Sequence, residues 1–363
     1  GDQNLWIDLL NDDHEKQYRK RPQLRDSILT QAAKDKSLPS VIIIDEVQKV
    51  PKLLDIAQSW IRKRKLLFIL TGSSARKLKR GAGNLLGGRA NVYSMFPLTS
   101  LEIGSQFNLQ KALEWGTLPE PWFLSSDRER SGFLRAYAST YLKEEILQEQ
   151  LIRKIDPFRD FLEVAAQCVG QPLNFEKIGR DVGVDHKTIQ AYFGILEETL
   201  VGIMLRPFHR SLRKSALQQP KFYYFDTGVQ RQLSGALGIP LLPQSSLYGQ
   251  VFEAWLIQEI IRLSIYREKD FRFSFFRSKH GTEVDLILSK GQRHVAIEIK
   301  AATSVDWVEV RTLARLVADF PGKCEAFYVS QDPQAQEVAQ VSCLHWSDFL
   351  RRFFGAPGSL QSG

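Results

Sequence analysis

The pattern of apolar and polar positions in the first part of the chain alternates between short apolar runs and an amphipathic stretch. Residues 41–44 and 66–70 are uninterrupted apolar runs, as expected of strands buried on both faces of a parallel sheet. Residues 5–10 predict a further strand. Between the two runs, apolar side chains recur at helical spacing, at Leu53, Leu54, Ile56, Ala57, Trp60 and Ile61. The pattern predicts an α/β fold whose parallel sheet is covered by helices.

Two acidic residues, Asp45 and Glu46, come directly after the first apolar run. They are expected at the carboxyl end of a strand, the edge where open α/β sheets bind ligands. In P-loop NTPases an acid at this place holds Mg²⁺, and a following Glu orients the water that attacks the γ-phosphate. Asp45 and Glu46 fit these catalytic roles, with Asp45 as the metal residue. The alternative is a loop whose acids are simply solvated.

Small polar residues and an arginine follow the second run. Ser73 or Ser74 is placed to sense a γ-phosphate, although Ser74 also fits the cap of a following helix. The glycine-rich residues 81–88 follow a basic helical stretch instead of a strand, so they predict a connector and not a phosphate-binding loop. Arg89 ends this connector and could reach a nucleotide in its own chain or in a neighbouring subunit. A solvated arginine is the alternative.

Residues 175–193 have the layout of a helix-turn-helix. Gly183 makes the turn and Asp185 caps the second helix. The predicted inward-facing side chains are Ile178, Val182, Ile189, Phe193 and Leu196. Those projecting from the start of the second helix, as DNA-contacting residues do, are His186, Lys187, Thr188 and Gln190.

A basic loop between the strands predicted at 200–205 and 221–225 would form a wing with Arg210, Arg213 and Lys214, which could lie on a phosphate backbone. Helix-turn-helix and wing together predict a winged helix. Such a module can also serve only for packing or protein docking, so DNA contact and packing both stay open.

The last third of the chain carries a pattern of acids and one lysine. A helix expected at 251–261 carries Glu253, and strands are predicted at 271–277, 282–288 and 294–300. Alternation puts Glu298 and Lys300 on one strand face, with Asp285 on the facing strand. This is the arrangement of PD-(D/E)XK nucleases, in which carboxylates hold Mg²⁺ and the lysine steadies the nucleophile. The metal residues would be Asp285 and Glu298. Alternatively, the acids and the lysine only pair with one another.

Composition narrows the class of protein. The 363 residues include 43% hydrophobic ones, enough for two or three domains, and carry a formal net charge of +8, which is compatible with nucleic acid or an acidic partner. The three cysteines are far apart and give no zinc signature. No apolar run approaches the length of a membrane span, so we expect a cytoplasmic protein without a membrane partner.

Five motifs resemble those of bacterial and archaeal AAA-type ATPases that carry a C-terminal domain of unknown function. They are V-I-I-I-D-E-V-Q-K-V-P from residue 41, F-I-L-T-G-S-S-A from 68, G-G-R from 87, F-P-L-T-S-L-E from 96 and G-T-L-P-E-P from 116. The resemblance covers essentially the whole chain. It implies that Asp45 and Glu46 are the Walker B pair, that Ser73 or Ser74 is the sensor and that Arg89 is the arginine finger. It also implies a C-terminal domain similar to the nuclease core.

One motif of that family is missing. No G-x-x-x-x-G-K-[ST] loop occurs, and the Gly322-Lys323 pair is followed by Cys324. We expect the loop upstream of Trp6, in a chain that is truncated or has lost it, and Gly1 favours truncation. We therefore predict that this chain binds ATP poorly or not at all.

The expected layout is a truncated AAA-type core at 1–105, a helical connector at 106–157, a winged helix at 158–236, a restriction-endonuclease-like α/β domain at 245–350 and a flexible tail at 351–363. For the full-length form we expect ATP- and Mg²⁺-dependent hydrolysis coupled to the C-terminal modules. The alternatives are Mg²⁺-dependent DNA cleavage and a non-catalytic scaffold that binds nucleic acid or protein. DNA and further copies of the chain are the other partners that the sequence allows.

Overall fold

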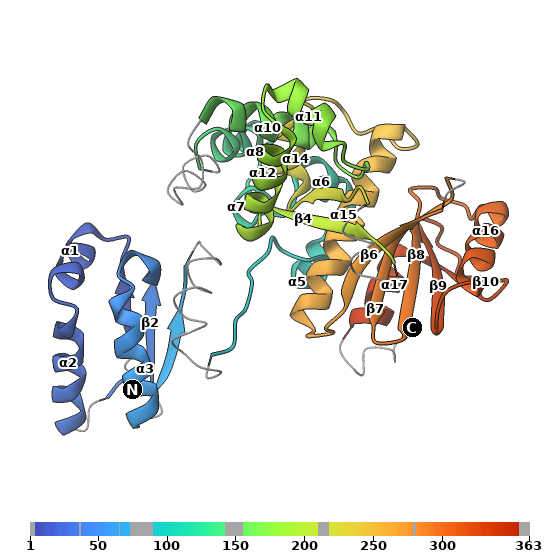
Figure 1. Cartoon of the computed structure of the whole chain (residues 1–363). Helices are drawn as coiled ribbons and strands as arrows, with labels where there is room; N and C mark the ends of the chain where they lie inside the picture. The colour runs from blue at the N-terminus through green and yellow to red at the C-terminus, as the bar shows by residue number, and fades with distance from the viewer. Residues whose placement is uncertain are drawn as a thin grey trace. The chain divides into compact units, whose positions relative to one another are not determined.

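The computed structural model describes residues 4–35, 38–64, 66–72, 90–141, 155–209, 218–278 and 281–355. The chain divides into two compact units (Figure 1). The first consists of residues 1–94 with Glu198–Leu200, and the second of residues 95–197 with 201–363.

The first unit is built on a parallel three-stranded sheet in the order β1 (Leu5–Asp8), β2 (Val41–Asp45), β3 (Leu67–Leu70). Within the described residues its helices are α1 (Asp12–Lys20), α2 (Gln23–Lys34), the 3-10 turn η1 (Val47–Lys49) and α3 (Lys52–Arg64). The helices cover one sheet face, where the buried side chains include Ile7, Ile42, Ile44, Leu53 and Trp60. The three strands and the helix after β2 are as predicted.

Burial of these strands differs from the prediction. Ile42 and Ile44 of β2 are buried, while their neighbours Val41 and Ile43 are only partly buried. Leu67 and Ile69 of β3 are exposed. The expectation of a buried strand was therefore wrong for β3, because successive side chains of a strand point to opposite faces and the helices that the structure describes in this unit pack on one of them.

The second unit begins with short helices. They are α5 (Ser100–Ile103), η2 (Gly104–Gln106), α6 (Leu109–Trp115), α7 (Pro119–Phe123), α8 (Asp127–Ala136) and the π-helical turn η3 (Tyr137–Tyr141), followed after the undescribed residues by α10 (Ile155–Gln167). Then come α11 (Phe175–Val182) and α12 (His186–Glu198), and later α14 (Thr227–Leu233).

The connection between α11 and α12 has the geometry that the sequence predicted. Gly183 ends α11 in the left-handed region, with φ of 76°. A Cβ on Gly179 would lie 2.6 Å from the Val184 carbonyl oxygen, so only glycine allows this close approach. The Asp185 carboxylate accepts bonds from the Lys187 and Thr188 backbone N–H groups. The five predicted inward-facing side chains, Ile178, Val182, Ile189, Phe193 and Leu196, are all buried.

An eight-stranded mixed sheet runs through the rest of the second unit, in the order β10-β11-β9-β8-β7-β6-β4-β5. Its strands are β4 (Gly202–Pro207), β5 (Lys221–Tyr224), β6 (Arg272–Arg277), β7 (Glu283–Lys290), β8 (Arg293–Ile299), β9 (Lys323–Ser330), β10 (Gln336–Val338) and β11 (Val341–His345). The strands expected around 271–300 are confirmed as β6, β7 and β8. The two strands expected for the wing form the hairpin β4–β5, and β4 pairs with β6. They therefore belong to the same sheet as the C-terminal strands.

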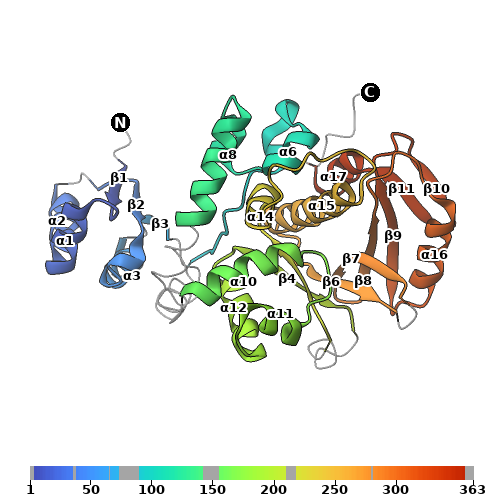
Figure 2. The same ribbon diagram turned by 90° about the horizontal axis from the view of Figure 1, so that it is seen from above.

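Helices cover both faces of this sheet (Figure 2). On one face lie α15 (Ser246–Tyr266) and α17 (Trp346–Phe354), whose side chains pack on those of β7, β8 and β9. On the other lies α16 (Trp307–Ala318). The sequence indicated an amphipathic helix at 251–261, but α15 has 21 residues and is buried on most of its surface, as in a central core helix. α17 extends past residue 350, where the tail was expected to start.

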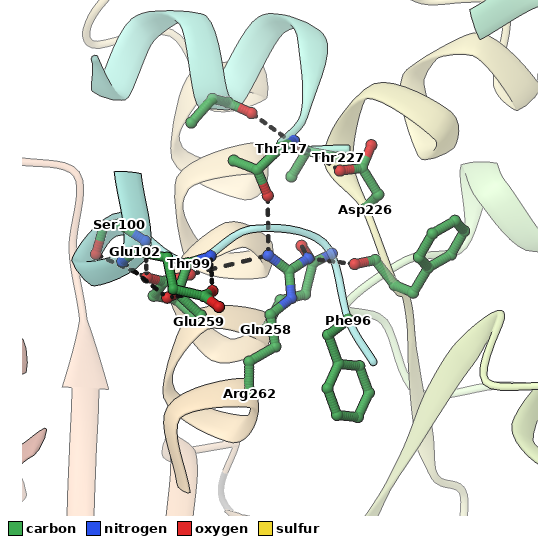
Figure 3. Close-up of polar contacts among 12 residues, drawn as sticks. Phe96, Thr99, Ser100, Glu102, Thr117, Asp226, Thr227, Gln258, Glu259 and Arg262 are labelled. Atoms are coloured by element: carbon green, nitrogen blue, oxygen red, sulfur yellow. Dashed lines mark hydrogen bonds and ion pairs between the residues drawn. The ribbon is translucent and has the colours of Figure 1, made fainter. Parts of the chain in front are cut away.

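Polar side chains on the buried α15 bind the segment that opens the second unit (Figure 3). Glu259 accepts hydrogen bonds from the Ser100 backbone N–H at 2.5 Å and from its hydroxyl at 2.7 Å. Arg262 donates to the Thr117 hydroxyl at 3.0 Å and to the Phe225 carbonyl, and lies 3.8 Å from Glu259. The motifs F-P-L-T-S-L-E and G-T-L-P-E-P thus supply partners for a fully buried ion pair.

Candidate functional sites

The acids of the first unit lie at the carboxyl end of its sheet, as predicted. Asp45 is the last residue of β2, and Asp8, the last residue of β1, is its partner in register. The Thr71 hydroxyl, just after β3, donates to the Asp45 carboxylate and accepts the Glu46 backbone N–H at 3.3 Å. The Thr71 backbone also pairs with Ile44 and Val47. Thr71 therefore fixes the turn that carries both acids.

Glu46 has a backbone conformation that residues other than glycine seldom adopt. Its φ is 56°, in the left-handed region, and its carboxylate accepts a hydrogen bond from the Gln48 side chain. Such backbone geometry at a strand end is common where a side chain is held for function. Thr71 was not among the predicted site residues, although its position as the first polar residue after the second apolar run was an available signal. Ser73, Ser74 and Arg89 lie outside the described residues.

The predicted nucleic-acid residues divide into three groups. His186, Lys187 and Gln190 are exposed on the first turns of α12. The Thr188 hydroxyl instead donates to Asp185 at 2.6 Å, so this side chain belongs to the helix cap. The predicted wing residues Arg210, Arg213 and Lys214 lie outside the described residues.

The four predicted nuclease residues come together around the ends of β7 and β8. Lys300 Nζ donates to Glu298 Oε1 at 2.7 Å, and Asp285 Oδ2 accepts the Ile299 backbone N–H at 2.8 Å. Glu253 reaches the same region from α15, close enough to Asp285 for the two charges to interact. We call Glu253, Asp285, Glu298 and Lys300 the carboxylate cluster. Its side chains come from one helix and two neighbouring strands.

The electrostatics of the carboxylate cluster are strongly perturbed. Burial, together with the nearby Asp285 charge, raises the pKa of Glu253 to about 7 and that of Glu298 to about 8. Burial also raises the pKa of Asp285. Burial lowers the pKa of Lys300, but the neighbouring Glu298 and Asp285 carboxylates outweigh it and leave this pKa above its usual range. Glu298 Oε2 is buried and has no hydrogen-bond partner within the described part of the chain.

Two residues that the sequence did not indicate also reach this cluster. The Tyr223 hydroxyl donates to Glu253 Oε1 at 3.0 Å, and Lys221 Nζ lies 3.9 Å from the same oxygen. Lys221 is also paired with Glu283 at the start of β7. Both residues come from β5, which the sequence placed in a wing. The available signal was a lysine opening an otherwise aromatic strand, but nothing local indicated its partner.

Two known families match the N-terminal and C-terminal parts of the chain, where the sequence motifs predicted an ATPase core and a C-terminal domain of unknown function. Residues 2–104 match the family described as AAA domain, and residues 248–346 match a domain of unknown function, DUF4143. These two matches support an AAA-type ATPase-like protein with a C-terminal domain of unknown function. Residues 106–239 of this ATPase-like protein match a second domain of unknown function, DUF8612. Lys221 and Tyr223 belong to that middle match, whereas the carboxylate cluster belongs to the C-terminal one.

Two curated relatives of this ATPase-like protein are each named as an uncharacterized protein. The proteins Rv2008c of Mycobacterium tuberculosis and Mb2031c of Mycobacterium bovis are each 24% identical over 296 residues. That alignment covers 79% of this chain and 66% of each relative. The chain thus spans just under two thirds of the length of these relatives.

Two solved structures were also matched. Protein VC1899 from Vibrio cholerae is 11% identical, with 86% of this chain and 90% of that chain covered and a TM-score of 0.24. Can2 from Sulfobacillus thermosulfidooxidans, solved in complex with cyclic tetra-adenylate, is 10% identical, with 96% and 98% covered and a TM-score of 0.23. At these TM-scores neither likeness supports an argument about this ATPase-like protein.

An AAA-type ATPase implies ATP with Mg²⁺, and the two sites differ in how they fit the metal. Asp45 fits, because Mg²⁺ on a nucleotide takes one or two carboxylates and leaves its other positions to phosphate and water. At the carboxylate cluster a metal held by protein alone would need more ligands. The described ranges contain no group of three or more His, Cys, Asp or Glu side chains that could hold a metal ion. The metal role of Asp285 and Glu298 therefore stays a prediction.

Membrane insertion of the ATPase-like protein gains no support from its helices. Within the described ranges, none of them combines the length and the apolar character that a bilayer span requires.

Proposed function

We propose that the protein carrying this chain hydrolyses ATP in its AAA-type unit and couples nucleotide state to the domains that follow. The observation that supports this best is the turn at the carboxyl end of β2, where Thr71 holds Asp45 and Glu46 together. Asp45 would bind the Mg²⁺ that accompanies ATP, and Glu46 would orient the attacking water. In this proposal Ser73 or Ser74 senses the γ-phosphate and Arg89 completes the charge stabilisation.

The proposal is tested by comparing ATP binding and hydrolysis with and without a phosphate-binding loop. This chain contains no G-x-x-x-x-G-K-[ST] string, so we expect it to bind Mg²⁺-ATP too weakly for titration calorimetry at micromolar concentrations. A form extended upstream to include such a loop should bind and hydrolyse ATP. Glu46→Gln in the extended form should retain binding and lose hydrolysis. An extended form with an intact loop and no hydrolysis would refute the proposal.

We propose phosphodiester cleavage as a second candidate function, at the carboxylate cluster. It is favoured by the convergence of four residues with raised pKa values from α15, β7 and β8. Perturbed carboxyl groups beside a lysine are suited to proton transfer and to stabilising charge on phosphate. Supercoiled plasmid, incubated with the chain with and without Mg²⁺, tests this proposal. Nicking should disappear in Glu298→Ala and in Lys300→Ala and persist in the control Glu325→Ala, whose side chain is an exposed acid on β9.

We propose that the exposed start of α12 contacts the nucleic acid that such a site would cut. Among the described residues, the exposed ones that would make this contact are His186, Lys187 and Gln190. In this proposal the phosphate backbone is also bound by Arg210, Arg213 and Lys214. DNA binding should weaken as salt concentration rises, and Lys187→Ala should reduce that salt dependence by about one counterion. The control Lys323→Ala changes an exposed lysine on β9. Binding that does not change when salt is doubled would argue for a packing role of these helices.

A further inference from the structure

Lys221 occupies an unusual place for a lysine. Its residue surface is 3% exposed, and its Nζ is paired with Glu283, lies 3.9 Å from Glu253 Oε1 and lies 5.2 Å from the centre of the Phe275 ring. Lysines are almost never fully buried unless they are paired, because burying an unpaired charge is costly. This lysine must therefore have acidic partners on neighbouring elements in order to be buried.

Tyr223 acts on the same oxygen from the same strand. Residues two apart in a strand point to the same face, so Lys221 and Tyr223 approach α15 together. The Tyr223 hydroxyl is fully buried and donates to Glu253 Oε1 at 3.0 Å. Glu253 is thus held through one carboxylate oxygen by two side chains of β5. Its own backbone lies on α15, outside the sheet that carries Asp285 and Glu298.

We propose that Lys221 is a positioning residue of the carboxylate cluster, with Tyr223 as its helper. It fixes the Glu253 carboxylate beside Asp285, so that the site is built jointly by β5 and by the C-terminal domain. This inference rests on the phosphodiester cleavage proposed above and adds a residue to that site from outside the C-terminal domain. Lys221 does not touch the substrate in this arrangement, because its Nζ is enclosed by Glu253, Glu283 and Phe275.

A purely structural role for Lys221 makes a different prediction. If the lysine only neutralised Glu283, removing both charges together would leave the cluster intact, because no uncompensated charge would remain. If it positions Glu253, removing both charges would still release the Glu253 carboxylate. The double variant Lys221→Met with Glu283→Gln therefore separates the two roles.

The experiment measures initial nicking rates of supercoiled plasmid over a range of plasmid concentrations, for wild type, Lys221→Met, Glu283→Gln, the double variant and Tyr223→Phe. We expect kcat to fall about 100-fold in Lys221→Met and in the double variant, as for a misplaced catalytic group, with KM changed by less than about twofold. Glu283→Gln should retain most of its activity, and Tyr223→Phe should lie between the two. Thermal unfolding of each variant checks that it is folded.

The outcomes are distinguishable. A double variant with wild-type kcat overturns the positioning role while leaving the cleavage proposal intact. A change in KM without a change in kcat also overturns it, because Lys221 would then act in binding. If the Lys221→Met single variant fails to fold, the double variant and Tyr223→Phe decide. A wild-type chain that cuts no plasmid refutes the cleavage proposal, and the inference is then refuted with it.

Discussion

Two glutamates on the same helix, Glu259 and Glu253, lie in polar surroundings of opposite kinds. Glu259 has no exposed side-chain surface. Its charge is compensated by Arg262, and its carboxylate accepts hydrogen bonds from the backbone N–H and the hydroxyl of Ser100. The Glu253 side chain is 26% exposed and lies near two further carboxylates, those of Asp285 and Glu283. Glu259 is therefore surrounded by an arginine and hydrogen-bond donors, while Glu253 has other carboxylates as well as Lys221 close to it.

The difference separates a structural role from a chemical one. A paired and hydrogen-bonded ion pair has a strong preference for one conformation, because any rearrangement exposes a buried charge without its partner. Burial raises the pKa of Glu259 as well, but burial together with the nearby Asp285 charge raises the pKa of Glu253 to about 7 and that of Glu298 to about 8, near neutral, where a group can both take up and release a proton. The Glu259 and Arg262 pair therefore holds Ser100 and Thr117 on α15, and the carboxylate cluster is the candidate for chemistry.

Arg262→Met tests the structural side of the comparison and should have the largest effect on stability. It removes the charge that compensates Glu259 and Asp226, both fully buried. Breaking a buried pair by removing one partner costs about 3–5 kcal/mol, so the free energy of unfolding in urea should fall by this amount. The control Arg351→Met breaks a surface pair with Asp348 and should cost at most about 1 kcal/mol. Equal losses in the two variants would contradict the assignment of Arg262.

Glu253→Gln tests the raised pKa of Glu253 through the pH dependence of the free energy of unfolding. Burial raises the pKa of Glu253 from 4.5 to about 7, so the folded state binds this proton more tightly than the unfolded state does. The stability contribution of Glu253 is therefore fully present below about pH 4.5 and is lost as pH rises through about 7. Each pKa unit of the shift corresponds to about 1.4 kcal/mol. Unfolding free energies measured from pH 4 to 9 should fall more steeply for wild type than for Glu253→Gln.

The outcome that would contradict this prediction is a pair of parallel pH profiles. Glu298 titrates in an overlapping range and remains in both proteins, so only the difference between the two profiles reports on Glu253. As a control, Glu325→Gln changes an exposed acid and should leave the profile unchanged.

The sequence could predict what depends on local spacing. The apolar run before Asp45, the inward-facing positions around Gly183 and the alternation that puts Glu298 beside Lys300 are periodic patterns within a few residues. The sequence could not predict contacts between residues that are far apart along the chain. Ser100 meets Glu259 159 positions away, and Lys221 meets Glu283 from a different hairpin. The helix α15 is a different case, because its sequence is apolar on all sides, which is typical of a buried helix, and the interpretation as an amphipathic helix was wrong.

Tyr223→Phe makes the smallest change and is the most specific probe of the surroundings of Glu253. It removes a single hydroxyl that donates to Glu253 and leaves the aromatic packing of β5 in place. A hydrogen bond to a charged group stabilises more than one to a neutral group, so the loss should be about 1.5–3 kcal/mol where Glu253 is ionised and about 1 kcal/mol where it is protonated. Urea unfolding at pH 5 and at pH 9 measures both values.

Tyr224→Phe is the matched control, because its hydroxyl donates to the uncharged Leu162 carbonyl, and its cost should be the same at the two pH values. A cost for Tyr223→Phe that is also independent of pH would mean that the Glu253 charge does not depend on β5.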